Sequence, residues 1–201
     1  MTAHVLTRQS HTARPALPVL GHMALPLARL HEVCGPARHS LAMRVAAATR
    51  GPVIWIAPTW SSDRPNPDGM QPLVDPGRFT FVSPQRPEDL LWSLEEVLRS
   101  GQVPLAVADL PEPPPLTPVR RLHLAAEAGA TDGPFAPLGL ILTPGDGGAP
   151  GVETRWHMAP AHGAHHTGWR LERRRARTAP PAAWHMTDIN GQWRMTAPDG
   201  N

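Results

Sequence analysis

Apolar and polar positions along the chain fall into blocks that predict short buried strands and amphipathic helices. The most regular block is 87–100, where apolar residues recur at helical spacing, acidic residues come early and Gly101 follows. Continuous apolar runs such as 53–56 are typical of strands buried on both faces of a parallel sheet. In chain order, we expect a helix at 41–50, strands at 53–56 and 78–82, a helix at 87–100, a strand at 103–108, a helix from Thr117, and a strand at 138–142. This order predicts an α/β fold with a mostly parallel sheet and helices on its faces.

Residues that begin and end helices set the expected boundaries. Thr117 is suited to an N-cap with Pro118 at the first helical position, and Gly129 follows what we expect to be the last turn. Residues 1–23 show no sustained period, so we expect a mobile N-terminal arm there. The folded domain is then expected at 24–188, with a flexible tail at 189–201.

The pattern changes after residue 151. Three segments, 152–158, 168–174 and 183–187, alternate apolar with polar residues and are separated by turn or loop residues. This alternation is typical of antiparallel strands with one exposed face. We therefore expect an antiparallel meander appended to the edge of the parallel sheet.

The amino-acid composition excludes several kinds of catalytic and binding site. All 19 basic residues are Arg, and the chain contains no Lys and no Tyr, which excludes a Schiff-base lysine and a lysine-bearing phosphate loop. Apolar residues make up 41% and charged residues 18%, as in a globular domain. The single Cys34 excludes an internal disulfide and a cysteine-based zinc site, and no apolar run approaches 18 residues. We therefore expect a cytoplasmic protein that does not associate with a membrane.

The segment before the first expected helix is the one candidate for a phosphate loop. A working loop needs GxxxxGK[ST], because a second glycine lets amides wrap the phosphates, a lysine reaches them and a hydroxyl holds magnesium. Counting from Gly35 places Ser40 where glycine is needed and Leu41 where lysine is needed. If the loop is two residues short, Ser40 takes the hydroxyl position and a histidine replaces the lysine. The degenerate loop comprises Gly35, Pro36, Arg38, His39 and Ser40. The alternative is a simple turn from strand to helix, in which Gly35 relieves backbone strain.

Two further features suggest binding. Asp109 ends an expected strand and is a candidate magnesium ligand, or else a polar residue at the carboxyl end of a buried strand. A basic run provides candidates for contacts with DNA phosphates, and its tryptophan could stack on single-stranded bases. These candidates are Trp169, Arg170, Arg173, Arg174, Arg175 and Arg177. The alternative is a solvated edge strand whose charges prevent aggregation.

Several segments occur in an order that resembles the ImuA family, whose members are diverged relatives of the RecA recombinase. They read LPLARLHEVCGP, LAMRVAAATRGPVIWI, DPGRFTFV, PEDLLWSLEEVLRSG and VPLAVADL, and the resemblance spans about residues 25–186. It implies a three-layer RecA-like core related to the P-loop NTPases, with Asp109 at the end of the strand that assists magnesium. Thr59 falls near the position of the catalytic glutamate, so the resemblance implies a core that has lost both the phosphate lysine and the catalytic acid.

ImuA proteins belong to a damage-inducible mutagenesis cassette. The resemblance implies a non-enzymatic accessory protein of translesion DNA synthesis that needs no cofactor. Its implied partners are an ImuB-like relative of the Y-family polymerases and an error-prone replicative-type DNA polymerase, with RecA and single-stranded DNA as further candidates. Two alternatives stay open: a weak ATPase that retains ATP and magnesium through Asp109 and Ser40, and a simple module that binds single-stranded DNA.

Overall fold

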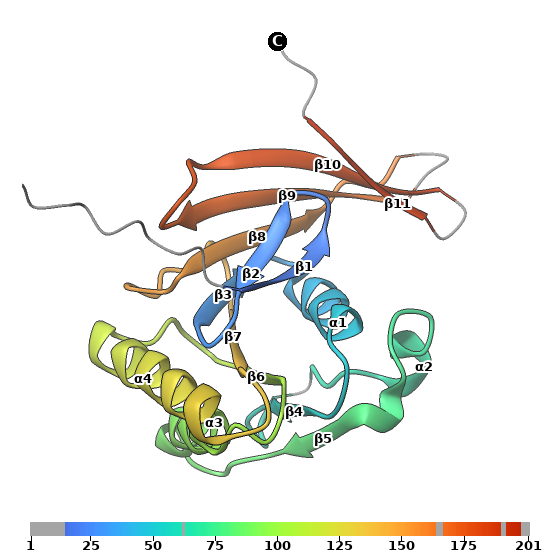
Figure 1. Ribbon diagram of the computed structural model, residues 1–201. Coiled ribbons are helices and arrows are strands. Elements are labelled where there is room, and N and C mark those ends of the chain that lie inside the picture. The colour runs from blue at the N-terminus through green and yellow to red at the C-terminus, as the bar shows by residue number, and fades with distance from the viewer. Residues whose placement is uncertain (1–14, 62, 164–166, 190–191, 198–201) are drawn as a thin grey trace, which may run out of the picture.

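A nine-stranded sheet forms the centre of the protein in the computed structural model, which describes residues 15–61, 63–163, 167–189 and 192–197. Its strands are β3 (Leu30–Cys34), β4 (Val53–Ile56), β5 (Phe79–Val82), β6 (Leu105–Asp109), β7 (Leu138–Thr143), β8 (Thr154–Pro160), β9 (Thr167–Ala176), β10 (Ala182–Ile189) and β11 (Gln192–Thr196). The spatial order is β11-β10-β9-β8-β3-β7-β6-β4-β5 (Figure 1).

The sheet divides into a parallel part and an antiparallel extension. β3 pairs in parallel with β7 on one side and β8 on the other, and parallel pairing continues through β6 and β4 to β5. From β8 onward, β9, β10 and β11 pair antiparallel with their neighbours. This confirms the predicted α/β class, the parallel sheet and the C-terminal meander at its edge.

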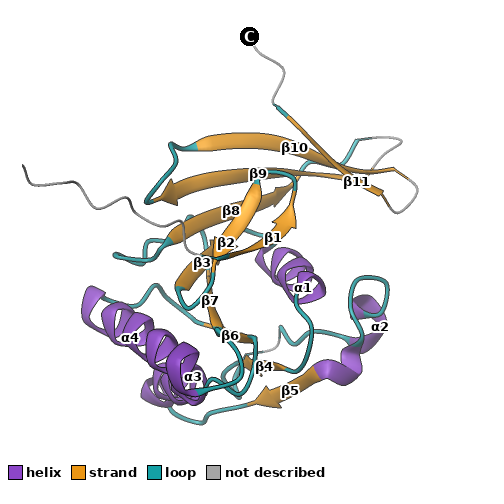
Figure 2. Ribbon diagram, in the orientation of Figure 1, coloured by secondary structure: helices purple, strands orange, loops and turns teal. Residues whose placement is uncertain are grey.

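Helices cover both faces of the sheet (Figure 2). They are α1 (Arg38–Ala48), the short α2 (Pro67–Met70), α3 (Pro87–Ser100) and α4 (Leu116–Asp132), with a 3-10 turn at Pro76–Arg78. α1 packs on one face against β3, β7 and β8, whereas α3 and α4 pack together on the other. Each side has its own apolar core, one including Trp55 and Trp156 and the other including Leu94 and Ile141. The sheet thus lies between two helical layers.

A hairpin precedes the sheet and corrects the expected N-terminal boundary. β1 (Ala16–Leu20) pairs antiparallel with β2 (Met23–Pro26), and Met23 and Leu25 are fully buried against the α1 side. Residues 16–23 are therefore part of the fold, because their apolar side chains pack on its core. Residues 1–14 of the expected arm lie outside the described residues.

The expected tail also needs correction. Residues 192–196 form β11, which pairs with β10, and the Trp193 ring packs on Trp169 with their centroids 4.4 Å apart. Burial of the apolar Trp193 ring against Trp169 explains why residues 192–196 join the sheet. Residues 190–191 and 198–201 lie outside the described residues.

The boundaries of α4 differ from the expected ones, and the reason lies in its packing. Pro115 takes the N-cap position, and the helix continues through Gly129 to Asp132. A Cβ placed on Gly129 would lie 2.0 Å from the carbonyl oxygen of Leu98 in α3 and 3.0 Å from the nitrogen of Gly101. Gly129 therefore allows two helices to touch at their backbones, and does not end α4.

Candidate functional site

The turn between β3 and α1 lies where the sequence predicts a degenerate phosphate loop. Gly35 has φ of +91°, and a Cβ there would lie 2.5 Å from the Met158 carbonyl oxygen. The Gly35 N–H donates to the Gly145 carbonyl (2.9 Å) and the Ala37 N–H to the Met158 carbonyl (3.0 Å). Pro36 has no N–H to donate. The two N–H groups of the turn, those of Gly35 and Ala37, thus donate to carbonyl oxygens of the protein.

A buried carboxylate holds in place the loop that supplies one of those carbonyls. Glu32, fully buried in β3, accepts hydrogen bonds from the Thr143 hydroxyl (2.8 Å) and from the N–H groups of Gly148 (2.8 Å) and Ala149 (3.2 Å). Its other oxygen accepts from Nε of Arg155 at 2.5 Å. Because the residues around Gly148 are fixed by Glu32, the nearby Gly145 carbonyl is presented to the turn.

Sequence reasoning did not assign this role to Glu32. The signal in the sequence is a glutamate at the centre of the run LHEVC, because a charge in a buried strand must have partners. Those partners come from residues more than 100 positions away, and no local pattern could identify them.

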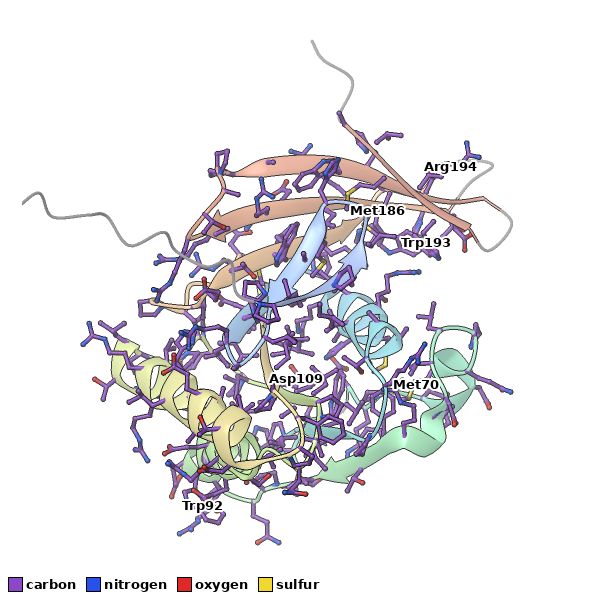
Figure 3. The ribbon with its side chains drawn as sticks, in the orientation of Figure 1. Met70, Trp92, Asp109, Met186, Trp193 and Arg194 are labelled. Atoms are coloured by element: carbon purple, nitrogen blue, oxygen red, sulfur yellow. The ribbon has the colours of Figure 1, made fainter. Side chains whose placement is uncertain are left out.

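Asp109, labelled in Figure 3, lies at the end of β6. Its side chain is only 7% exposed. Its Oδ2 is 2.6 Å from Nε2 of His39, and its Oδ1 is 3.8 Å from Nε of Arg38. The Trp55 ring lies next to His39, with the two ring centroids 6.1 Å apart. The structure thus brings together three of the predicted residues, and both oxygens of the candidate magnesium ligand face side chains that can carry positive charge.

The two other positions expected to matter for nucleotide chemistry lie near this edge. Ser40 is half-buried in the first turn of α1. Thr59 follows β4, and its N–H donates to the Pro84 carbonyl at 3.2 Å. Cys34, at the end of β3, is buried, and burial together with the Glu32 charge raises the pKa of its thiol to about 12, which makes it unreactive at neutral pH.

The arginine-rich segment forms β9, and it is not an edge strand, because β8 and β10 pair on either side of it. The alternative of an edge strand protected by charge is therefore wrong. Opposite Arg155 and Trp156 of β8 stand Arg175 and Arg173, so Arg174 is the extra residue of a β-bulge. The bulge interrupts the simple alternation of side chains expected from the sequence.

Acidic residues neutralise much of this arginine cluster. Arg170 and Arg174 both donate to Glu172, at 2.6 and 2.9 Å, and Arg174 also donates to Asp146 at 2.8 Å. Partial burial raises the pKa of Glu172, but these hydrogen bonds outweigh burial and hold it below its usual value. Nε of Arg177 lies 3.2 Å from Glu153.

Arg173 and Trp169 lie among aromatic side chains. The Arg173 guanidinium is 5.2 Å from the centroid of the Trp184 ring, and its Nε donates to the Pro180 carbonyl. Trp169 packs between Trp193 and the edge of His162, whose ring centroid is 5.2 Å away. Trp169 is therefore part of a packed aromatic cluster, while Arg170, Arg175 and Arg177 stay exposed.

Comparisons with known proteins add no assignment, since no family model matches the chain and no curated protein matches it. Among the described residues, no group of histidine, cysteine or acidic side chains is arranged to hold a metal ion. In the same part of the chain, no helix is both long and apolar enough to span a membrane.

Proposed function

We propose that the chain is a non-catalytic scaffold of the ImuA kind, in which a RecA-like core without nucleotide turnover binds a lesion-bypass polymerase. One observation carries the proposal: in the turn after β3, the N–H groups of Gly35, Ala37 and Arg38 are already bonded within the protein. Gly35 and Ala37 donate to carbonyls of neighbouring strands and loops, and Arg38 donates to Gly35.

A phosphate loop works by leaving several amides free to surround the anion. Here the carbonyl oxygens of Gly145 and Met158 accept hydrogen bonds from the turn. These oxygens carry partial negative charge, so they would repel a phosphate at the same position. In α/β sheets of this kind, ligands bind at the carboxyl ends of the strands. The closed turn and the pairing of Asp109 with His39 favour loss of nucleotide binding at that edge.

A scaffold would bind its partner proteins through surfaces other than the edge where nucleotide binding is lost. The partners that the resemblance implies are the ImuB-like relative of the Y-family polymerases, the error-prone replicative-type polymerase, and RecA. The mechanism is then simultaneous binding, which raises the local concentration of one partner near another without any chemical step on this chain.

Co-purification from DNA-damaged cells tests the proposal. The tagged chain should recover the Y-family relative, and Asp109→Asn should recover it equally well, because a scaffold needs no carboxylate chemistry at that position. Recovery of no polymerase or recombinase component would overturn the assignment. Recovery that requires Asp109 together with ATP would favour the ATPase alternative.

Direct binding of single-stranded DNA is a second candidate function. The observation that favours it is the exposure of Arg170, Arg175 and Arg177 on and after β9. Their contacts would be with phosphates, so binding should weaken steeply with salt and show no base preference.

A further inference from the structure

A groove of about 390 Å³ runs beside α4, on the opposite side of the sheet from α1. From α4 it is lined by Leu116, Arg120 and Leu124, and across from the helix by Arg29, Gly151 and Arg177. It lies away from the turn after β3 and uses one residue, Arg177, of the arginine cluster.

The α4 wall is an apolar stripe that the core does not use. Leu116, Arg120 and Leu124 are spaced four residues apart, so they lie on one face of the helix. The core takes a different face, through residues such as Val119 and Leu122. Leu116 is 37% exposed and Leu124 is 64% exposed. The two exposed leucines lie on either side of an arginine at the edge of the groove. Together they form a surface that an apolar side chain can contact.

The charges around the groove leave positive charge in excess. Arg29 pairs with Glu127 and lies 3.6 Å from Glu153, which also pairs with Arg177. Arg120 adds a further exposed cation, so three arginines face two carboxylates.

His123 also lines the groove, and its hydrogen bonds fit a neutral ring. Its Nδ1 accepts from the Leu30 N–H at 3.3 Å, and its Nε2 donates to the Gly151 carbonyl at 3.1 Å. Burial lowers its pKa, although Gly151 and Glu153 oppose the shift. The excess positive charge of the groove is therefore assigned to the arginines.

We propose that this groove docks an acidic amphipathic segment of a partner protein. An apolar side chain of the segment lies between Leu116 and Leu124, and its flanking carboxylates meet Arg120 and Arg177. Leucines surrounded by cations favour a peptide as the ligand over a nucleic acid. Grooves that bind single-stranded nucleic acid stack the bases on aromatic side chains, whereas the exposed apolar residues here are leucines. The inference deepens the scaffold proposal and rests on it for the partner's role.

Direct binding of a defined peptide to the full chain tests the groove. The probe is a fluorescein-labelled peptide of Leu, Glu and Ala, about 16 residues or four helical turns long, with leucines at four-residue spacing. Two reference peptides are a scrambled order of the same composition and a version with Lys replacing Glu. Fluorescence anisotropy should show tighter binding of the acidic amphipathic peptide than of either reference, and weaker binding at high salt.

Matched variants locate the binding. Leu124→Ser and Arg120→Gln should each weaken peptide binding about tenfold, which corresponds to about 1.4 kcal/mol in binding free energy. Trp92→Ser changes an exposed tryptophan of α3, and Arg86→Gln changes the exposed arginine that precedes this helix; both should leave binding unchanged. Figure 3 shows Trp92 pointing away from the sheet. Unchanged thermal melting of all four variants establishes that they fold.

Three outcomes overturn the groove proposal: equal binding of the three peptides, groove variants that bind like the wild type, or an oligothymidylate that binds at Arg120 where the peptide does not. The scaffold proposal is scored separately by co-purification. Recovery of the polymerase without peptide binding rejects the groove alone, whereas peptide binding without any polymerase rejects the scaffold alone.

Discussion

His31 provides a quantitative test of how the central strand is buried. It is fully buried in β3, with Nε2 2.9 Å from the Pro26 carbonyl and Nδ1 2.8 Å from the Thr154 hydroxyl. The Thr154 oxygen also accepts the Trp156 indole N–H at 3.0 Å. In this network the neutral ring donates from Nε2 and accepts at Nδ1. Burial is the main reason that the pKa of His31 falls to about 4 from its ordinary 6.5.

The direction of the pH effect follows from proton linkage. Between pH 6.5 and about 4, the unfolded chain binds a proton at His31 that the native protein does not bind. The free energy of unfolding therefore has its full value above pH 6.5 and decreases as the pH falls to 4. At about 1.4 kcal/mol for each pKa unit, this one residue removes about 3 kcal/mol.

Urea denaturation of the wild type and of His31→Gln, over the pH range from neutral to about 4, measures that loss. Gln does not titrate, and its amide can donate to Pro26 and accept from Thr154. The difference in the free energy of unfolding between the two proteins should shift by about 3 kcal/mol in favour of the variant as the pH falls. Parallel curves for the two proteins would refute the account of a neutral, desolvated His31.

Three further predictions concern the packing of the core and the surface that would bind DNA. Glu32→Gln removes the buried charge that pairs with the half-buried Arg155 and should cost about 3 kcal/mol in urea denaturation, whereas the same change at the exposed Glu96 should cost almost nothing. Gly129→Ala should lower stability by about 1–3 kcal/mol, because its Cβ would overlap the α3 backbone. Gly69→Ala is the control, because a Cβ at that position meets nothing within 4 Å. The free energy of unfolding of this variant should equal that of the wild type. The exposed arginines on and just after β9 are Arg170, Arg175 and Arg177. If they bind DNA, the triple change to Gln should weaken oligothymidylate binding and flatten its salt dependence. Equal affinity of the triple variant and the wild type would reject that function.

Local signals explain which elements the sequence predicted well. α3 was predicted at its observed bounds, because a proline at its start, acidic residues in its first turn and Gly101 in the left-handed region at its end all agree. Gly129 resembles a helix end by the same rules, yet its role depends on a contact with α3 that no local pattern contains. The β1–β2 hairpin was missed because its strands are short and include prolines.

The candidate site was predictable only in part, for a similar reason. The position of Asp109 at the end of a strand follows from the sequence, but its pairing with His39 joins residues 70 positions apart. The carbonyls that close the turn after Gly35 come from the β7–β8 loop and from β8 itself, so the closure depends on which strands flank β3. The spacing of the arginines predicts one basic strand, and it contains no signal for the bulge at Arg174.

Equilibrium binding of Mg-ATP to the wild-type chain tests the central claim most directly, since the account holds that the turn after β3 is closed to phosphate. Ligand at a hundred times its Kd would stabilise the protein by about 2.7 kcal/mol and raise the Tm by roughly 5–10 °C in a domain of this size. We predict no saturable change in Tm and no phosphate release above background. A saturable rise of several degrees, with phosphate release abolished by Asp109→Ala, would contradict the account.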